Sequence, residues 1–294
     1  MSTWSEADIP DQTGRVALVT GANSGLGFET ARALAQHGAH VVMGCRNPDR
    51  AADAEARINE TSPSGSVEVL LVDMADLESI AAGAEGFLAD HDRLDLLVNN
   101  AGIMATPKGA TAQGFEQQFG VNHLGHFALT APLLPALLAA DGSRVVNVSS
   151  NAHKFGRMNF DDLMGERSYN PWRAYGQSKL ANLLFTRELQ RRLAAGGVDT
   201  IAVAAHPGAS KTELGKESGG ILSTLMNLAR PVTDRLMSQS AAMGALPQLR
   251  AAVDPAVVGG EYYGPSGFGE MQGHPERVDT TARARSDEDA ARLW

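Results

Sequence analysis

Short apolar runs alternate along the chain with longer segments in which apolar residues recur every three or four positions. A continuous apolar run is typical of a strand buried on both faces, whereas the longer period indicates a helix. The predicted strands cover residues 16–20, 40–44, 67–72, 94–98, 144–148, 200–205 and 260–263. The predicted helices cover residues 28–36, 49–59, 76–89, 113–139, 173–195 and 237–250. This alternation predicts an α/β fold, a doubly wound parallel sheet with helices on both faces.

The same pattern gives no sign of a linker or an internal repeat. We therefore expect a loose N-terminal arm at residues 1–14 and a single domain over residues 15–294. Two stretches, residues 154–171 and 212–234, fit the alternation poorly. We expect both to lie above the carboxyl edge of the sheet, where ligands bind in this architecture, and we interpret residues 212–236 as a substrate lid.

Composition excludes several classes of protein. The chain has 294 residues, of which 43% are hydrophobic, enough for a sizeable core, and a formal net charge of −9, which argues against a nucleic-acid partner. Cys45 is the only cysteine, so an internal disulfide and a zinc cluster of cysteines are both excluded. Residues 1–11 are polar, and no apolar run reaches the ~18 residues of a membrane helix. We expect a soluble protein of the cytoplasm without a membrane span.

A glycine-rich loop, Thr20-Gly21-Ala22-Asn23-Ser24-Gly25-Leu26-Gly27, joins the first predicted strand to the first predicted helix. Glycines allow a tight turn and a close approach of the backbone to a phosphate, and the helix that follows offers unpaired N–H groups. Alone, such a loop is equally consistent with an ordinary tight turn. Its position between a strand and a helix favours phosphate binding.

Tyr175 and Lys179 lie four residues apart at the start of a predicted helix and share one of its faces. The pKa of a free phenol is about 10, and a nearby ammonium lowers it toward the range useful for acid–base chemistry. On spacing alone, a partly buried tyrosine beside a solvated lysine is the simpler interpretation. Ser149 and Ser150 follow a predicted strand, where they either bind a substrate oxygen or cap the next segment.

Taken in order, these motifs resemble the non-extended branch of the short-chain dehydrogenase/reductase family. The matches are TGxxxGxG at residues 20–27, NNAG at 99–102, a serine after the fifth strand, YxxxK at 175–179, and Pro207-Gly208 followed by Thr212. Extended-branch epimerases usually space their glycines as TGxxGxxG, which this chain does not. Residues 122–127, 147–153 and 178–182 further resemble the retinol dehydrogenase and protochlorophyllide reductase-like group. The resemblance implies a Rossmann-type fold.

The resemblance also implies a function, an oxidoreductase that interconverts an alcohol and a carbonyl on a small molecule with NAD(P). Tyr175 is then the acid in reduction and the base in oxidation, and Lys179 lowers its pKa and holds the nicotinamide ribose. Ser150 orients the substrate oxygen, and Asn122 positions a water that links Lys179 to solvent. Asp73 is expected to hold the adenine, and Asn99 to form a turn under the cofactor. The full set of implied cofactor-binding residues is Gly21, Asn23, Ser24, Gly25, Leu26, Gly27, Arg46, Asp73, Met74, Asn99, Ala101, Gly102, Tyr175, Lys179, Pro207, Gly208 and Thr212.

The second predicted strand indicates which cofactor binds. Enzymes that prefer NAD place a carboxylate about 20 residues after the glycine loop, where it holds the ribose 2′-hydroxyl. Here that position falls at Cys45, and no Asp or Glu occurs between Glu29 and Asp49. Arg46 can pair with a 2′-phosphate, and Arg50 adds a second positive charge. We expect NADP(H), with Arg46 as the main determinant; the alternative is that Arg46 is a solvated residue at a strand end.

Three further expectations concern the substrate, metals and assembly. One face of a predicted helix in the expected lid is apolar, and it is formed by Ile221, Leu222, Leu225, Leu228 and Ala229. This face either binds an apolar substrate or packs on the core or on another subunit. No metal is expected, since zinc-ligand spacing is absent among His123, His126, His153 and His206. The family commonly pairs the helices at 113–139 and 173–195 between subunits, which implies a homodimer or homotetramer.

A different class of function is also open, an NAD(P)-binding regulatory protein of the same fold without significant turnover. The presence of Ser150, Tyr175 and Lys179 together counts against it.

Overall fold

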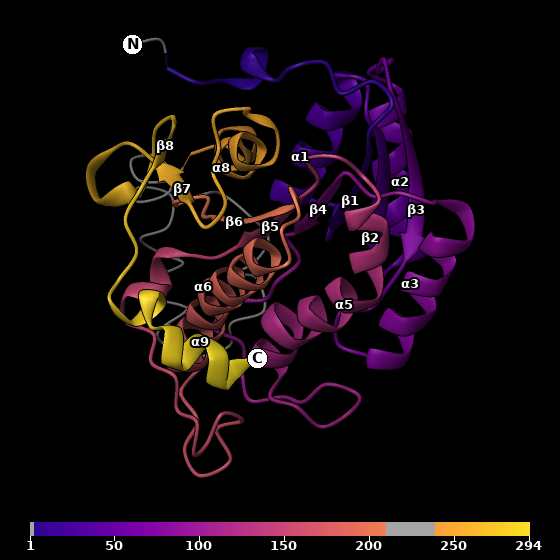
Figure 1. Cartoon of the computed structure of the whole chain (residues 1–294). Coiled ribbons are helices and arrows are strands. Elements are labelled where there is room, and N and C mark those ends of the chain that lie inside the picture. The colour runs from indigo at the N-terminus through magenta and orange to yellow at the C-terminus, as the bar shows by residue number, and fades with distance from the viewer. Residues whose placement is uncertain (1–2, 210–238) are drawn as a thin grey trace, which may run out of the picture.

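One eight-stranded sheet forms the centre of the computed structural model, which describes residues 3–209 and 239–294 (Figure 1). Its strands are β1 (Val16–Thr20), β2 (His40–Cys45), β3 (Ser66–Leu71), β4 (Leu96–Asn99), β5 (Arg144–Val148), β6 (Ile201–Ala205), β7 (Tyr262–Pro265) and β8 (Pro275–Arg277). They lie in the order β3-β2-β1-β4-β5-β6-β7-β8, and all neighbours are parallel except β7 and β8. The predicted doubly wound sheet is confirmed, with β8 as an antiparallel strand that the pattern did not predict.

Helices cover both faces of this sheet (Figure 1). On one face lie α1 (Gly25–Gln36), α2 (Pro48–Asn59) and α8 (Ala241–Val253). On the other lie α3 (Leu77–Asp90), α5 (Gly125–Leu138) and α6 (Pro171–Ala195), and the C-terminal helix α9 (Asp287–Leu293) packs on α6. Neighbouring strand residues Leu18 and Val19 therefore point into different cores, and both are fully buried.

The long helix predicted over residues 113–139 is interrupted. The Glu116 carboxylate accepts hydrogen bonds from the N–H groups of Gln118 and Phe119, so the short helix α4 begins at Gln117 (Gln117–Phe119). A π-helical turn, Gly120–Leu124, then leads into α5. Extra residues of this kind inside a helix change the direction of the side chains that they carry. Short 3₁₀ turns occur at Glu6–Asp8, Asn151–Lys154, Phe268–Glu270 and Arg283–Arg285.

The N-terminal arm is not loose over the residues that the structure describes. The Glu6 carboxylate pairs with the Arg32 guanidinium of α1 at 2.7 Å, and Ile9 is buried in the core beside α1. The expectation of a loose arm at residues 1–14 is therefore wrong for residues 3–14, because an ion pair and an apolar contact hold them on the domain.

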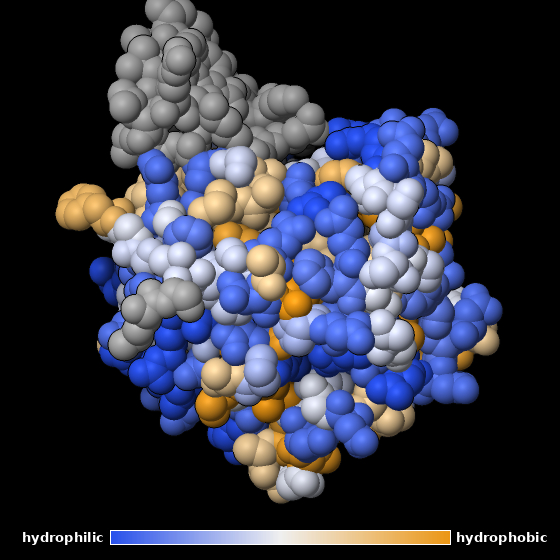
Figure 2. All heavy atoms as spheres, turned by 90° about the horizontal axis from the view of Figure 1, so that it is seen from above, coloured by the Kyte–Doolittle hydropathy of each residue, from blue (hydrophilic) through white to orange (hydrophobic). Residues whose placement is uncertain are grey.

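Figure 2 shows one face of the molecule, on which hydrophobic residues form small separate groups among hydrophilic ones. Within residues 3–209 and 239–294, no helix combines the length and the apolar character needed to cross a membrane. The expected lid at residues 212–236 lies outside the described residues.

Candidate active site

The glycine-rich loop joins β1 to α1 at the carboxyl edge of the sheet. Gly21 and Gly25 have positive φ angles of 68° and 56°, which favour glycine. A Cβ atom on Gly27 would collide with the Gly21 carbonyl oxygen and lie 2.6 Å from Asn100 Nδ2. Ser24, at the N-cap of α1, makes no side-chain hydrogen bond to the helix. The loop thus leaves the first turn of α1 uncapped by a side chain, as a phosphate site requires.

A second loop, which follows β4, is hydrogen-bonded to the end of β1, where the glycine-rich loop begins. Thr20 Oγ1 accepts hydrogen bonds from the N–H groups of Asn100 and Ala101, both at 2.9 Å. Asn100 Nδ2 donates to the Thr20 carbonyl oxygen at 2.8 Å. Because β1 and β4 are neighbours in the sheet, these bonds hold the two loops side by side.

The two loops border a cleft of about 230 Å³. Eleven of the predicted cofactor-binding residues line it, namely Gly21, Asn23, Ser24, Gly25, Leu26, Gly27, Arg46, Asp73, Met74, Ala101 and Gly102. Sequence reasoning missed Gly44, Val72, Asn100, Ile103, Gln117 and Val121, which also line it. A larger cavity, of about 660 Å³, lies between α6 and β8 and shares no lining residue with the cleft.

Asn99 does not line this cleft. Its Nδ2 donates to Asn147 Oδ1 of β5 at 2.8 Å and to Thr130 Oγ1 of α5 at 3.2 Å, and the residue is buried. Asn99 is the last residue of β4, and its side chain points into the core rather than toward the loops. Its neighbour Asn100 takes the place at the cleft that was expected for Asn99.

The end of β2 carries Cys45 and Arg46. Cys45 is buried, and burial raises the pKa of its thiol to about 11. Hydrogen bonds with the backbone of Ala22 and Asn23 act in the opposite direction but are the smaller effect. The thiol is therefore neutral at physiological pH. Arg46 is exposed and lines the cleft. Arg50 and Arg57 line an adjoining hollow of about 320 Å³ that shares Asn23 and Ser24 with the cleft.

Tyr175 and Ser150 meet at the carboxyl end of β5. Asn170 caps the start of α6, where its side chain accepts hydrogen bonds from two backbone N–H groups, and this places Tyr175 in the second turn. Tyr175 is buried, and burial raises the pKa of its phenol, while a hydrogen bond with Ser150 acts in the opposite direction. The expected lowering of the Tyr175 pKa is thus not found in this structure.

Lys179 follows one turn later on α6. Its Nζ lies 5.8 Å from the centre of the Tyr175 ring and donates to the Val148 carbonyl oxygen at 3.1 Å. Burial lowers the pKa of Lys179 to about 8. A fully charged ammonium beside the phenol would lower the pKa of Tyr175, but burial is the dominant effect on both side chains.

Asn122 lies in the π-helical turn and bridges two elements. Its Oδ1 accepts from the N–H of Ile103 at 2.8 Å, and its Nδ2 donates to the Ile103 carbonyl oxygen and to Ser178 Oγ, both at 2.9 Å. A Cβ atom on Gly102 would lie 3.1 Å from Asn122 Oδ1 and 3.4 Å from Lys179 Nζ. Glycine at 102 therefore keeps the space between Asn122 and Lys179 open.

The predicted turn after β6 is present. Gly208 has a φ angle of 65°, and its Cβ position is closed by the Met271 carbonyl oxygen. Gln239 Nε2 donates to the Pro207 carbonyl oxygen at 2.9 Å. Neither Pro207 nor Gly208 lines the cleft, and Thr212 lies outside the described residues.

The four histidines singled out from the sequence are buried near this site. Burial lowers the pKa of His123 to about 4, of His126 to about 3 and of His153 to about 4. His206 pairs with Glu270 at 3.0 Å, and that hydrogen bond is the main reason why the pKa of Glu270 falls to about 2. Glu270 lies about sixty residues further along the chain, so no local sequence pattern predicts this pair.

Comparison with known proteins identifies the family. Residues 15–220 match the model of the short chain dehydrogenase family. Human retinol dehydrogenase 12 is 42% identical over 283 residues, which cover 96% of this chain and 84% of that protein. A crystal structure of an uncharacterized protein from Mycobacterium paratuberculosis is 43% identical with a TM-score of 0.82, covering 100% of this chain and 95% of that one.

A second solved structure bears on the cofactor. A protein from Beutenbergia cavernae, described as a putative NAD(P)-dependent gluconate 5-dehydrogenase with NADP bound at low occupancy, is 29% identical with a TM-score of 0.66, covering 85% of this chain and 94% of that one. The chain therefore belongs to the short-chain dehydrogenase family, as an NAD(P)-dependent dehydrogenase or reductase similar to the retinol dehydrogenases.

Proposed function

We propose that the protein is an NADP-dependent oxidoreductase that interconverts an alcohol and a carbonyl on an apolar small molecule, with Tyr175 as the acid and base. The observation that carries this proposal is the meeting of Tyr175, Ser150 and Lys179 at the carboxyl end of β5. A protein without turnover has no need to bury a phenol and an ammonium together, because burying a charged group has a cost in stability.

The residues that line the cleft suit the phosphates of a dinucleotide. Glycines at 21, 25 and 27 let the backbone approach a phosphate, and Gly102 lies between this cleft and Lys179. When bound, the nicotinamide supplies the hydride in reduction and accepts it in oxidation.

Tyr175 would move the proton. In reduction its Oη would donate the proton to the carbonyl oxygen, while Ser150 Oγ donates a hydrogen bond to the same oxygen. In oxidation the phenolate would take the proton from the alcohol. Because burial raises the pKa of Tyr175, the phenol is protonated at neutral pH, which is the form required for reduction.

Arg46 supports the choice of NADP(H). It is exposed on the rim of the cleft, and the position before it, where an NAD enzyme places a carboxylate, holds a buried neutral thiol. A 2′-phosphate beside Arg46 would pair with its guanidinium, and the adjoining hollow adds Arg50 and Arg57 together with Asp49 and Asp53.

An apolar substrate is supported by two facts of different kinds. The relatives are named retinol dehydrogenases, and retinol is an apolar alcohol. The stripe from Ile221 to Ala229 adds a sequence pattern, although it lies outside the described residues.

The test is NADPH consumption with a series of aldehydes and ketones of increasing alkyl length, including retinal. Wild type should turn over the longer members faster, and Tyr175→Phe should lower turnover by ~100-fold or more with little change in NADPH binding. Tyr169→Phe is the matched control, since the Tyr169 hydroxyl donates to the Thr106 carbonyl oxygen at 2.9 Å, outside the proposed catalytic group. NADPH binding without turnover of any member would instead favour a regulatory protein, and near wild-type turnover by Tyr175→Phe would overturn the role of Tyr175.

A further inference from the structure

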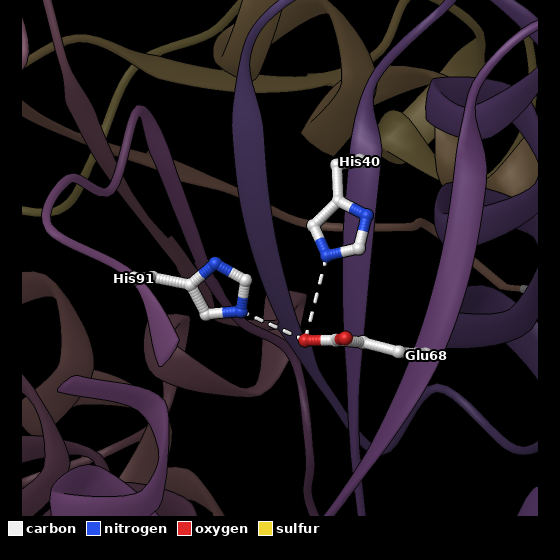
Figure 3. A group of neighbouring side chains, drawn as sticks. All are labelled: His40, Glu68 and His91. Carbon is white, nitrogen blue, oxygen red and sulfur yellow. Dashed lines mark hydrogen bonds and ion pairs between the residues drawn. The ribbon is translucent and has the colours of Figure 1, made fainter. Parts of the chain in front are cut away.

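Three side chains converge at the amino end of the sheet (Figure 3). His40 is the first residue of β2, Glu68 belongs to the edge strand β3, and His91 follows the last turn of α3. The register pairs His40 with Ser66, so Glu68, two residues further on, shares a face of the sheet with His40. Helix α3 covers that face, and its end brings His91 over both.

The distances suit one metal ion. Glu68 Oε1 lies 2.8 Å from His91 Nε2 and 3.4 Å from His40 Nε2, and the three candidate ligand atoms all lie within 4.8 Å of one another. Zinc bonds of about 2.0–2.2 Å at tetrahedral angles put neighbouring ligand atoms about 3.3–3.5 Å apart. The distance from Glu68 to His40 already matches this spacing, and the other separations lie within about 1.5 Å of it.

Neighbouring groups hold the two imidazoles in place. His40 Nδ1 is hydrogen-bonded to Ser66 Oγ at 2.7 Å, which leaves Nε2 directed at Glu68. The His91 ring packs on Phe87 with ring centres 4.7 Å apart. A hydrogen bond to the second ring nitrogen is the usual way in which proteins orient a histidine ligand.

The site is open on one side. The side chains of His91, His40 and Glu68 are 13%, 30% and 45% exposed, so an ion could enter and keep water as a further ligand. Two imidazoles and one carboxylate are a ligand set typical of zinc and its neighbours, whereas Mg²⁺ and Ca²⁺ prefer oxygen ligands alone. Within residues 3–209 and 239–294, no other group of three or more histidines, cysteines and carboxylates has this spacing.

We propose that His40, Glu68 and His91 form a binding site for Zn²⁺ or a neighbouring late first-row divalent cation. The ion links the edge strand β3 and strand β2 to the end of α3. The carboxyl end of β2 lies roughly 17 Å from His40 at ~3.3 Å per residue, and Arg46 and the cofactor cleft lie at that end, so the ion stabilises the fold and takes no part in the reaction. The proposal is independent of the proposed function.

The experiment is calorimetric titration of the chelator-treated full chain with ZnCl₂, in parallel with thermal unfolding. We expect one equivalent to bind with a Kd of micromolar order or tighter. We also expect the Tm to rise by about 5–10 °C at a hundredfold excess of Zn²⁺ over Kd. The variants His40→Gln, Glu68→Gln and His91→Gln should each weaken binding by at least about 10-fold. His37→Gln is the matched control, because His37 lies outside the group and binds the Ala33 carbonyl oxygen.

The competing interpretation is a pair of histidine–carboxylate ion pairs that binds no metal. It predicts no saturable heat with Zn²⁺ and the same Tm with and without the ion, and either result would overturn the proposal. Equal affinity of the wild type and all three ligand variants would overturn it as well, by placing the bound ion elsewhere. If one variant fails to fold, the other two still decide the matter.

Discussion

Arg46 is the residue on which the proposed cofactor preference depends. Hydrogen bonds to charged groups contribute roughly 1.5–3 kcal/mol, so Arg46→Ala should weaken NADPH binding by about 10-fold or more and leave NADH binding nearly unchanged. Fluorescence titration of both cofactors into both proteins measures this, with Arg167→Ala as a control because Arg167 is exposed and outside the cleft. Equal losses for the two cofactors would show that Arg46 does not contact the 2′-phosphate.

Lys179 is a residue whose proposed role opposes stability. Burial lowers its pKa from 10.5 to about 8, so the folded state disfavours the ammonium. At pH 7 the ammonium is present in both the folded and the unfolded state. Lys179→Met removes it, so the variant should have a higher Tm and a free energy of unfolding greater by up to roughly 3 kcal/mol. The Val148 carbonyl oxygen would keep its second donor, Asn182 Nδ2.

The pH dependence of this difference has a definite sign. The wild-type penalty is complete below pH 8 and shrinks as the pH rises through 10.5, above which lysine is neutral in both states. Thermal unfolding at pH 7 and pH 10 should therefore show a stabilised Lys179→Met variant at pH 7 and a smaller difference at pH 10. A variant less stable than wild type at pH 7 would contradict the argument.

Side-chain direction limited the sequence prediction at this scale. The NNAG motif correctly placed a loop at the cleft, but it did not distinguish Asn99, which points into the core, from Asn100, which lines the cleft. That difference depends on where β4 ends. The direction of the Tyr175 pKa shift could not be predicted from the sequence either. The spacing shows that Lys179 is near, but it gives no measure of how deeply the phenol is buried.

At the scale of elements, two helical glycines differ in the space around them. A Cβ atom on Gly27 in α1 would collide with the glycine loop, whereas one on Gly86 in α3 would have Leu70 Cδ1 at 3.8 Å as its nearest neighbour. Gly27→Ala should lower stability by about 1–3 kcal/mol and weaken cofactor binding. Gly86→Ala should raise stability by about 0.5–1 kcal/mol, since alanine is the better helix former.

Chemical denaturation of the two variants beside wild type tests this contrast. An unchanged stability and NADPH affinity in Gly27→Ala would mean that α1 does not need to approach the loop so closely.

The sequence predicted elements well where one physical signal dominated. The buried parallel strands are mostly apolar runs, and β1 and β5 have their predicted bounds. The missed elements lacked such a signal: β8 has three residues with two of them exposed, and α9 is short and mostly polar. The interruption of the helix at 113–139 depends on the capping of α4 by Glu116 and on the π-helical turn. Neither feature alters the spacing of apolar residues, so the hydrophobic pattern did not predict it.

At the scale of the whole molecule, the C-terminal end covers part of the helical face that was expected to pair between subunits. Trp294 stacks on Phe185 of α6 with ring centres 5.8 Å apart and meets Phe127 of α5 edge to face at 5.1 Å. The Arg192 guanidinium lies 4.4 Å from the centre of the Trp294 ring. A homodimer or homotetramer remains our proposal, and an interface on α5 and α6 has to include α9.

Trp294→Ala tests the importance of this contact. Removing the stacked ring and its cation–π partner should lower stability by about 1–3 kcal/mol. Phe268→Ala is the control, because Phe268 is fully exposed and should be neutral. Thermal unfolding gives the stability, and light scattering at micromolar concentration shows whether the same substitution changes the assembly. An unchanged Tm would mean that α9 contributes little to the fold.

Contacts between distant parts of the chain were the least predictable. His40, Glu68 and His91 are separated by more than twenty residues at each step, and only the register of β2 with β3 and the length of α3 bring them together. The spacing of zinc motifs along a sequence does not detect a group of this kind.

The buried pair of Asn99 and Asn147 has a consequence for how the chain folds. The two residues are register partners on β4 and β5, the strands at which the first half of the sheet meets the second. A slip of one residue would place Asn147 opposite Val98, in an apolar core, and would leave both amides without their partner. Each buried amide left unpaired costs about 1–3 kcal/mol. Misaligned intermediates are therefore less stable than the correct one, so this amide pair favours faithful joining of the two halves during folding.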